Sequence, residues 1–240
     1  MKQRLDQALA KLGLVASRSQ AEGYVKLGQV TVNGKIITKS GFLVSEADDI
    51  KVTAQEQYVS RAGLKLASVS QTLGLNFQGK IMLDVGSSTG GFTDYALRNG
   101  ATKVFAVEVG TDQLHPSLHG NPQIELHEKT DIRDFTPSTP ADIVVMDVSF
   151  VSLRDILPHI AKISTPKTQI VAMVKPQFEA GESSFKHKGV IKNDAMRRKI
   201  LQDFELWAKK LFVIAAKADS EVAGAKGNRE RFYLLQKTKS

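Results

Sequence analysis

A short apolar run that breaks into a glycine-rich loop constrains the fold of this chain more than any other feature. Residues 81–85 are apolar except for Asp84, and the loop 86–91 that follows contains only Gly, Ser and Thr. The run is typical of a buried parallel strand, and the loop is typical of a tight turn into a helix that begins near Thr93. Because glycines let a ligand approach the backbone closely, we predict a nucleotide-type cofactor site at this turn.

The order of residues in the loop disfavours two better-known cofactor classes. Gly86 and Gly91 are spaced as in a phosphate-binding loop, but Phe92 and Thr93 follow where Lys and then Ser or Thr are needed. The dinucleotide fingerprint requires glycine where Ser88 stands, which disfavours nicotinamide and flavin cofactors. An adenosine cofactor without phosphates remains, with S-adenosylmethionine as the leading candidate, and a purely structural turn is the alternative for the loop taken alone. The cofactor-binding candidates in this segment are Asp84, Gly86, Ser87, Ser88, Thr89, Gly90, Gly91, Phe92 and Thr93.

Composition limits the mechanisms that are open to this chain. Its 240 residues, of which 42% are hydrophobic, suffice for one buried core and a small additional module. It contains no cysteine, which excludes disulfides, thiolate metal sites and a cysteine nucleophile. The histidines are scattered, so no metal site is predicted. We find no secretory signal and no apolar run near the roughly 18 residues of a membrane span, which predicts a cytoplasmic protein without a membrane partner.

The charge of the chain indicates a polyanionic partner. The formal net charge is +8, and most of the excess of Lys and Arg lies after residue 135. A basic balance of this kind favours nucleic acid as the partner, although a solvated basic surface would give the same count.

The N-terminal residues follow a pattern of two helices and a hairpin. Apolar residues at helical spacing predict helices at 4–14 and 17–27. Alternating residues on both sides of Asn33-Gly34 predict a hairpin, and a further strand is expected at 49–52. The chain is accordingly divided into three segments, which are a small α+β domain at 1–55, a linker at 56–59 and a second domain at 60–240.

From Ser60 onward, predicted strands alternate with predicted helices. The apolar segments with strand character are 81–85, 103–108, 124–127, 142–147, 169–175, 212–216 and 232–236. This alternation predicts an α/β fold with a doubly wound, mostly parallel, seven-stranded Rossmann-like sheet, whose ligand sites lie beyond the carboxyl ends of the strands. Glu108 ends the second of these strands, where an acid can accept hydrogen bonds from ribose hydroxyls. Asp131 and Ile132 are expected to border the adenine.

Two lysines and two acids are predicted to converge at that edge of the sheet. Asp147 and Lys175 end strands, Lys65 lies on the first helix of the domain, and Glu230 precedes the last strand. A ribose hydroxyl is a very weak acid, so its methylation needs a base, and desolvation beside another cation favours the neutral form of a lysine. Lys175 is therefore the candidate base, with Lys65 favouring its neutral form and stabilising the developing alkoxide. Asp147 and Glu230 would hold the lysines and orient the ribose, and Asp147 also borders the predicted cofactor site.

The first 55 residues resemble the small RNA-binding domain named after ribosomal small-subunit protein S4. The matching residues are Arg4-Leu5-Asp6, Ser17-Arg18, Ala21, Gly28-Gln29-Val30, Val32-Asn33-Gly34 and Lys39. The resemblance implies that the helical pair presents basic residues to the RNA backbone, where such contacts position a substrate without reading its sequence. The RNA-binding candidates are Arg4, Arg18, Lys26 and Lys39, together with Arg61 at the start of the second domain.

The second domain resembles the FtsJ-type ribose methyltransferases, and the whole chain is similar to the TlyA family, whose members are described as hemolysins and as 2′-O-ribosyl rRNA methyltransferases. The matching stretches are Tyr58-Val59-Ser60-Arg61 with Lys65, residues 84–92, 145–150 and 174–179, and Gly227-Asn228 with Glu230. The resemblance implies S-adenosylmethionine as the cofactor, ribosomal RNA or ribosomal subunits as the partner, and the Lys-Asp-Lys-Glu set as the catalytic residues. Glu108 and Asp131 depart from the more usual Asp and Asn at their positions.

Three alternatives are weighed against this function. A base-amino methyltransferase would carry two prolines and an aromatic residue after the fourth strand, where this chain has Val148-Ser149-Phe150 after Asp147. A non-catalytic RNA-binding assembly factor fits the charge but gives no reason for the four polar residues. A membrane-active hemolysin is suggested by the family label alone.

The segment 179–192, rich in Gly, Ser and Lys, is a candidate lid.

Overall fold

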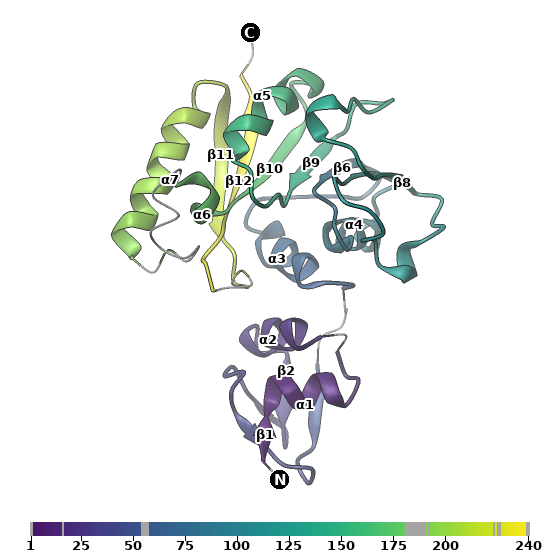
Figure 1. The fold of residues 1–240 in the computed structure, drawn as a ribbon, viewed down its shortest axis with the longest axis vertical. Helices are drawn as coiled ribbons and strands as arrows, with labels where there is room; N and C mark the ends of the chain where they lie inside the picture. The colour runs from purple at the N-terminus through teal and green to yellow at the C-terminus, as the bar shows by residue number, and fades with distance from the viewer. Residues whose placement is uncertain are drawn as a thin grey trace.

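The computed structural model of the chain describes residues 2–15, 17–53, 58–180, 191, 193–222, 224 and 227–238. Within them, a small N-terminal domain is followed by a larger α/β domain (Figure 1). The elements of the small domain are β1 (Gln3–Arg4), α1 (Leu5–Lys11), α2 (Arg18–Lys26), β2 (Val30–Val32), β3 (Lys35–Ile36), β4 (Leu43–Val44) and β5 (Ile50–Val52). Strands β3, β2 and β5 form an antiparallel sheet in that order, and β1 pairs with β4.

The predicted helices and hairpin of this domain are present, with both ends of the first helix corrected. That helix spans Leu5–Lys11, whereas residues 4–14 were predicted. It begins at Leu5 because Arg4 pairs with Leu43 in the strand pair β1 and β4. Those two-residue strands were not predicted. The hairpin turn at Asn33-Gly34 is confirmed, since both residues adopt positive φ angles, of 52° and 77°, as a type I′ turn requires.

The larger domain contains the predicted seven-stranded sheet. Its elements are α3 (Arg61–Ser70), β6 (Ile81–Val85), α4 (Gly91–Arg98), β7 (Lys103–Val107), η1 (Pro116–Leu118), β8 (Ile124–His127), η2 (Ile132–Asp134), β9 (Ile143–Met146), α5 (Leu153–Ile163), β10 (Gln169–Val174), α6 (Pro176–Glu179), α7 (Asp194–Ala208), β11 (Phe212–Asp219) and β12 (Arg231–Lys237). The strand order is β11-β12-β10-β9-β6-β7-β8. Every pair among β10, β9, β6, β7 and β8 is parallel, and β12 is antiparallel to both of its neighbours.

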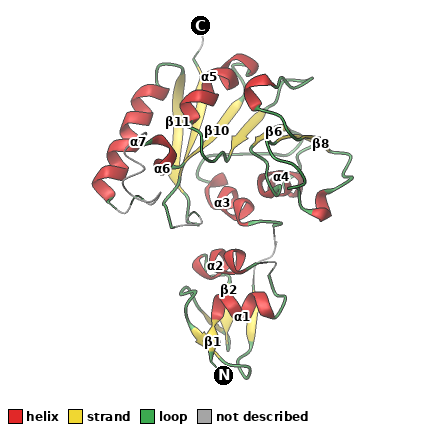
Figure 2. Cartoon of the chain, in the orientation of Figure 1, coloured by secondary structure: helices red, strands yellow, loops and turns green. Residues whose placement is uncertain are grey.

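Helices cover both faces of this sheet (Figure 2). Successive strand residues point to opposite faces, so Met82 packs in one apolar cluster with α3 and α4, whereas Leu83 packs in a second cluster with α5 and α7. The doubly wound α/β fold predicted from the sequence is therefore confirmed. The chain leaves β6 toward β7 and later returns to β9 on the other side of β6, which makes the crevice between the carboxyl ends of β6 and β9 the expected ligand site.

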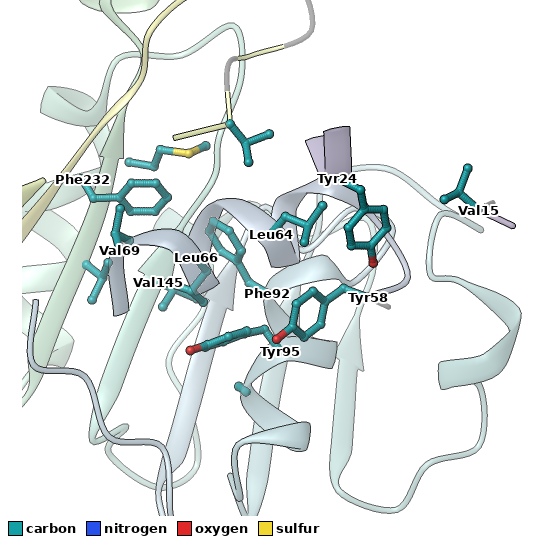
Figure 3. Close-up of a cluster of buried hydrophobic side chains, with 14 of the residues drawn as sticks. Val15, Tyr24, Tyr58, Leu64, Leu66, Val69, Phe92, Tyr95, Val145 and Phe232 are labelled. Carbon is teal, nitrogen blue, oxygen red and sulfur yellow. The ribbon is translucent and has the colours of Figure 1, made fainter. Parts of the chain in front are cut away.

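One apolar cluster continues from the larger domain into the small one. Figure 3 shows Tyr24 of α2 beside Leu64 of α3 and Tyr58, and farther along the cluster Phe92 and Phe232. Helices α2 and α3 pack closely, since a Cβ on Gly23 would lie 3.0 Å from the Leu64 side chain. The Gln20 amide also donates a hydrogen bond to the Tyr58 carbonyl at 2.5 Å. The small domain is therefore packed directly against the helix that carries Lys65.

Candidate active site

Two adjoining cavities lie at the carboxyl ends of the parallel strands. The larger, of about 430 Å³, is lined by Gly86, Glu108, Asp131, Ile132, Asp147 and Phe150 among others. The smaller, of about 170 Å³, is lined by Asp84, Ser87, Thr89, Phe92, Asp147 and Lys175 among others. Asp147 and Ser149 line both, so the two cavities meet beside the end of β9. A bent ligand that occupied both cavities would have its central atoms at that meeting point.

The glycine-rich loop adopts a conformation that only its small residues allow. Gly86 has φ +77°, and a Cβ there would lie 3.0 Å from the Asp147 carbonyl. Gly90 has φ +85°, and a Cβ there would collide with Leu118 and Leu114. The loop thus turns sharply from β6 into α4 and leaves its backbone open to the cavities.

Glu108 is fixed at the wall of the larger cavity by this loop. Its carboxylate accepts hydrogen bonds from the backbone N–H of Ser88 at 3.0 Å and from that of Gly110 at 2.9 Å. These bonds hold the acid at the tip of β7, where a ribose-binding carboxylate was predicted. At the far end of the same cavity, Asp131 accepts hydrogen bonds from Arg133, which hold the pKa of Asp131 at about 2.

Asp84 offers an unpaired acceptor at the smaller cavity. The side chain is buried, Thr93 donates a hydrogen bond to Oδ2 at 2.7 Å, and Oδ1 has no hydrogen-bond partner among the described residues. Burial, and to a lesser extent the negative charge of Asp147, raises the pKa of Asp84 to about 7. A buried acid without a counter-ion fits a ligand that brings an ammonium group. The methionine part of S-adenosylmethionine carries such a group, so the residues present fit this cofactor.

The four predicted catalytic residues form two ion pairs. In the first, which we call the enclosed pair, Lys65 Nζ lies 2.5 Å from Glu230 Oε2, and the two side chains are 7% and 3% exposed. In the second, the cavity pair, Lys175 Nζ lies 2.6 Å from Asp147 Oδ1, with exposures of 10% and 16%. Lys175 also donates a hydrogen bond to Ser149 Oγ at 2.7 Å. Of the two pairs, only the cavity pair lines the cavities described above.

Two residues that the sequence reasoning left without a role lie at the same place. Ser149 contacts Lys175, and Phe150 is 92% exposed at the rim of the larger cavity. Phe150 has a left-handed backbone with φ +65°, which is unusual for an aromatic residue, and its ring centroid lies 5.2 Å from that of Phe178. The feature of the sequence that could have identified Ser149 and Phe150 is their position directly after a buried strand that ends in an acid.

The predicted RNA-binding residues differ in whether they have an ion-pair partner inside the domain. Arg4 and Arg18 both pair with the buried Asp6 at 2.9 Å. Burial alone would raise the pKa of Asp6, but hydrogen bonds from the two arginines lower it to about 2. Lys26 and Lys39 are exposed, and Arg61 is half-buried at the start of α3. The two arginines therefore have a structural partner inside the domain, whereas the two lysines point into solvent.

Three further points concern a metal site, a membrane-spanning helix and the predicted lid. No cluster of three or more His, Asp or Glu side chains that could hold a metal ion occurs in the described part of the chain. Of the helices in that part, none has the length and hydropathy needed to cross a membrane. Most of the predicted lid, namely 181–190 and residue 192, lies outside the described residues.

Comparison with known proteins identifies the family. A family model described as FtsJ-like methyltransferase matches residues 58–237, and one described as the S4 domain matches residues 3–50. The 23S rRNA (cytidine-2′-O)-methyltransferase TlyA of Campylobacter jejuni is 35% identical over 241 residues, covering 92% of this chain and 94% of that protein. Hemolysin A of Brachyspira hyodysenteriae is 36% identical over 236 residues, covering 95% of this chain and 97% of that protein.

A solved structure from Streptococcus thermophilus agrees with these relatives. It superimposes with a TM-score of 0.73 at 35% sequence identity and covers 100% of this chain and 90% of that chain. The resemblance noted in the sequence is thereby confirmed. The chain belongs to the FtsJ-like methyltransferase family and carries an S4 domain at its N-terminus.

Proposed function

We propose that this protein methylates a ribose 2′-hydroxyl of ribosomal RNA, with Lys175 as the general base. The observation that carries the proposal is the position of the cavity pair, in which Lys175 lines the smaller cavity and contacts Asp147, which lines both cavities. Relatives at about one-third identity, such as the Campylobacter protein named for 2′-O-methylation of 23S rRNA, support the same substrate class.

When bound, S-adenosylmethionine supplies a methyl group on a positively charged sulfur, which leaves as a neutral thioether when the methyl moves to oxygen. Neutral Lys175 Nζ accepts the proton of the 2′-hydroxyl as the new O–CH₃ bond forms, and becomes an ammonium. Asp147 Oδ1, 2.6 Å away, stabilises that ammonium. Asp84 and the 86–91 loop hold the methionine end, and Glu108 holds the adenosine ribose.

The enclosed pair has a supporting role in this proposal. Glu230 fixes the Lys65 side chain at 2.5 Å in a site where both are almost fully buried. A buried cation held in place needs no reorganisation when negative charge develops on the ribose oxygen, so it favours the alkoxide electrostatically. Glu230 thus holds Lys65, as Asp147 holds Lys175.

Phe150 provides a surface for the base of the target nucleotide. An aromatic ring that is 92% exposed at a cavity rim offers a face on which an unstacked base can lie. Its contact with Phe178 fixes the orientation of that face. The small domain, with exposed Lys26 and Lys39, binds the RNA backbone at a distance from the reacting nucleotide.

Methyl transfer from radiolabelled S-adenosylmethionine to naked rRNA and to assembled ribosomal subunits tests the proposal. Nucleoside analysis of the labelled RNA is expected to locate the methyl group on a ribose. Label on a base would overturn the ribose assignment. Cofactor binding by calorimetry together with no label on any ribosomal substrate would instead support the non-catalytic assembly factor.

A further inference from the structure

The amine of Lys175 has one hydrogen-bond acceptor and one ion-pair partner at fixed positions. Ser149 Oγ accepts a hydrogen bond from Nζ at 2.7 Å, and Asp147 Oδ1 lies 2.6 Å from Nζ in an ion pair. Both partners follow β9, and Lys175 follows the neighbouring parallel strand β10. All three residues line the smaller cavity. The sheet itself therefore sets the spacing between the lysine and its two partners.

The two partners together restrict the neutral form of the lysine. A neutral amine nitrogen has four tetrahedral directions, which are occupied by Cε, two hydrogens and one lone pair. Ser149 accepts one of the hydrogens. The negative charge of Asp147, 2.6 Å from Nζ, repels the lone pair, which is therefore directed away from the carboxylate. Without the hydrogen bond to Ser149, the amine could rotate about the Cε–Nζ bond and change the direction of its lone pair.

We propose that Ser149 is a positioning residue that, together with Asp147, directs the lone pair of neutral Lys175 into the cavity where the 2′-hydroxyl arrives. The inference rests on the proposed role of Lys175 as the base. Ser149 forms no bond to the substrate in this step. The proton passes from the ribose oxygen to Nζ, and Ser149 keeps accepting one N–H hydrogen before and after the transfer.

The loop that carries Ser149 is anchored to the segment that carries Lys175. Glu179, at the end of α6, accepts hydrogen bonds from Ser152 Oγ and from the Leu153 backbone N–H, both at 2.7 Å. The Phe150 ring also packs against the Phe178 ring. Two hydrogen bonds and one ring contact therefore join the segment after β9 to the segment after β10. These contacts keep Ser149 beside Lys175.

The test compares Ser149→Ala with Ser149→Thr in single-turnover methyl transfer to assembled ribosomal subunits. We expect Ser149→Ala to lower the rate by about 10- to 100-fold, as misplaced catalytic groups do, with cofactor affinity unchanged. The loss should persist at the alkaline plateau of the pH–rate profile, where the amine is neutral in every variant. Ser149→Thr retains a hydroxyl and should recover most of the rate. Ser164→Ala is the matched control, because that buried hydroxyl has no hydrogen-bond partner in the described part of the chain and lies at the far end of α5.

A double-mutant cycle separates this inference from the role of Lys175. If Ser149 acts through Lys175, Ser149→Ala should change nothing further in a Lys175→Met background. An equal loss of rate from Ser149→Ala in the wild type and in Lys175→Met would overturn the inference. A Ser149→Ala variant that binds the cofactor more weakly, or that reacts at the wild-type rate, would also overturn it. A fully active Lys175→Met variant would contradict the proposed function itself.

A spectrum of the protein alone tests the contact without any substrate. The ¹⁵N-ammonium signal of Lys175, assigned by its loss in Lys175→Arg, should be protected from exchange in the wild type and in Ser149→Thr. It should broaden in Ser149→Ala. Equal protection in all three proteins would show that Ser149 does not hold the amine, and would overturn the inference.

Discussion

The enclosed pair and the cavity pair have the same chemistry in two different surroundings. Each joins a lysine to a carboxylate at 2.5 to 2.6 Å. Lys65 and Glu230 are sealed between α3 and the start of β12, whereas Lys175 and Asp147 line the wall of the smaller cavity. The lysine of the cavity pair also donates a hydrogen bond to Ser149, and it faces a cavity in which it can exchange a proton with a ligand or solvent.

Because the two pairs differ in burial, substitutions in them should affect different properties, namely the stability of the fold and the rate of the reaction. Removing one member of a sealed ion pair leaves a buried charge without a counter-ion, which destabilises the folded state. Removing one member of the cavity pair leaves a charge that ligand or solvent can reach. The enclosed pair should therefore affect folding more strongly, and the cavity pair should affect the reaction.

The largest effect is expected from Lys175→Met. Loss of a general base lowers kcat by about 10²- to 10⁴-fold, while the dissociation constant of S-adenosylmethionine should stay nearly unchanged because Lys175 is not one of the groups proposed to hold it. Single-turnover kinetics and calorimetry measure the two quantities. If cofactor binding were lost together with the rate, Lys175 would belong to the cofactor site. The cavity pair would then not act in the reaction step, as the comparison with the enclosed pair requires.

Glu230→Ala should have its main effect on stability. It leaves the Lys65 ammonium buried and unpaired, which costs about 3 to 5 kcal/mol of the free energy of unfolding. Urea denaturation measures this loss, and Asp147→Ala is the matched variant at the cavity pair, for which we expect a smaller loss. The double variant Lys65→Met with Glu230→Gln should be more stable than Glu230→Ala. Equal destabilisation by the two alanine variants would contradict the comparison.

Asp84 extends the comparison to a buried acid that has no lysine. Its pKa is about 7 in the folded protein against 3.8 for the ordinary side chain, so folding favours its neutral form. The penalty for ionised Asp84 is absent below pH 3.8, grows as the pH rises, and is complete above pH 7. Asp84→Asn should therefore gain stability over the wild type between pH 5 and pH 8 in urea denaturation. A difference that is the same at both pH values would show that Asp84 does not titrate in this range.

The same substitution should weaken the cofactor. Asp84→Asn removes a charged acceptor from the proposed ammonium site, a loss of about 1.5 to 3 kcal/mol in binding free energy. Calorimetry in buffers of different ionisation enthalpy should also detect proton release when the wild type binds S-adenosylmethionine near pH 7. Unchanged affinity in the variant would place the ammonium elsewhere.

The smallest effect is expected from Phe150→Ala. The ring is 92% exposed, so folding should be unaffected. The loss of base stacking should lower kcat/KM for RNA, which corresponds to about 1 to 3 kcal/mol of lost binding free energy in the transition state. Leu206→Ala, at an exposed apolar residue of α7, is the control and should leave the rate unchanged. Equal rates for both variants would show that Phe150 does not contact the target base.

The seven strands of the sheet, and the edge at which the polar residues after β7, β9 and β10 lie, were predictable from the sequence because they depend on local patterns. Each parallel strand is a short apolar run, and the polar residue that ends it must lie at the carboxyl edge. The sequence could not tell which lysine meets which acid, because Glu230 is 165 residues from its partner in the chain and the pairing depends on how β12 returns beside β10.

Other features depend on single contacts that leave no periodic signal. The strands β1 and β4 are two residues long, too short for alternation to be recognised. Arg4 and Arg18 resemble free RNA-binding residues in the sequence, yet both converge on Asp6. The hydrogen bond from Lys175 to Ser149 exists only because β9 and β10 are neighbours in register.

The packing of α2 against α3 fixes the distance between the S4 domain and Lys175. Because Gly23 leaves no space beside Leu64 and the apolar cluster runs through this contact, the two domains cannot slide apart without exposing apolar surface. In the proposed function, a ribose would be methylated only if it lay at one fixed distance from the RNA segment bound by the small domain. Target choice would depend on the folded shape of the RNA over that span, and unfolded RNA with the same nucleotide would be a poor substrate.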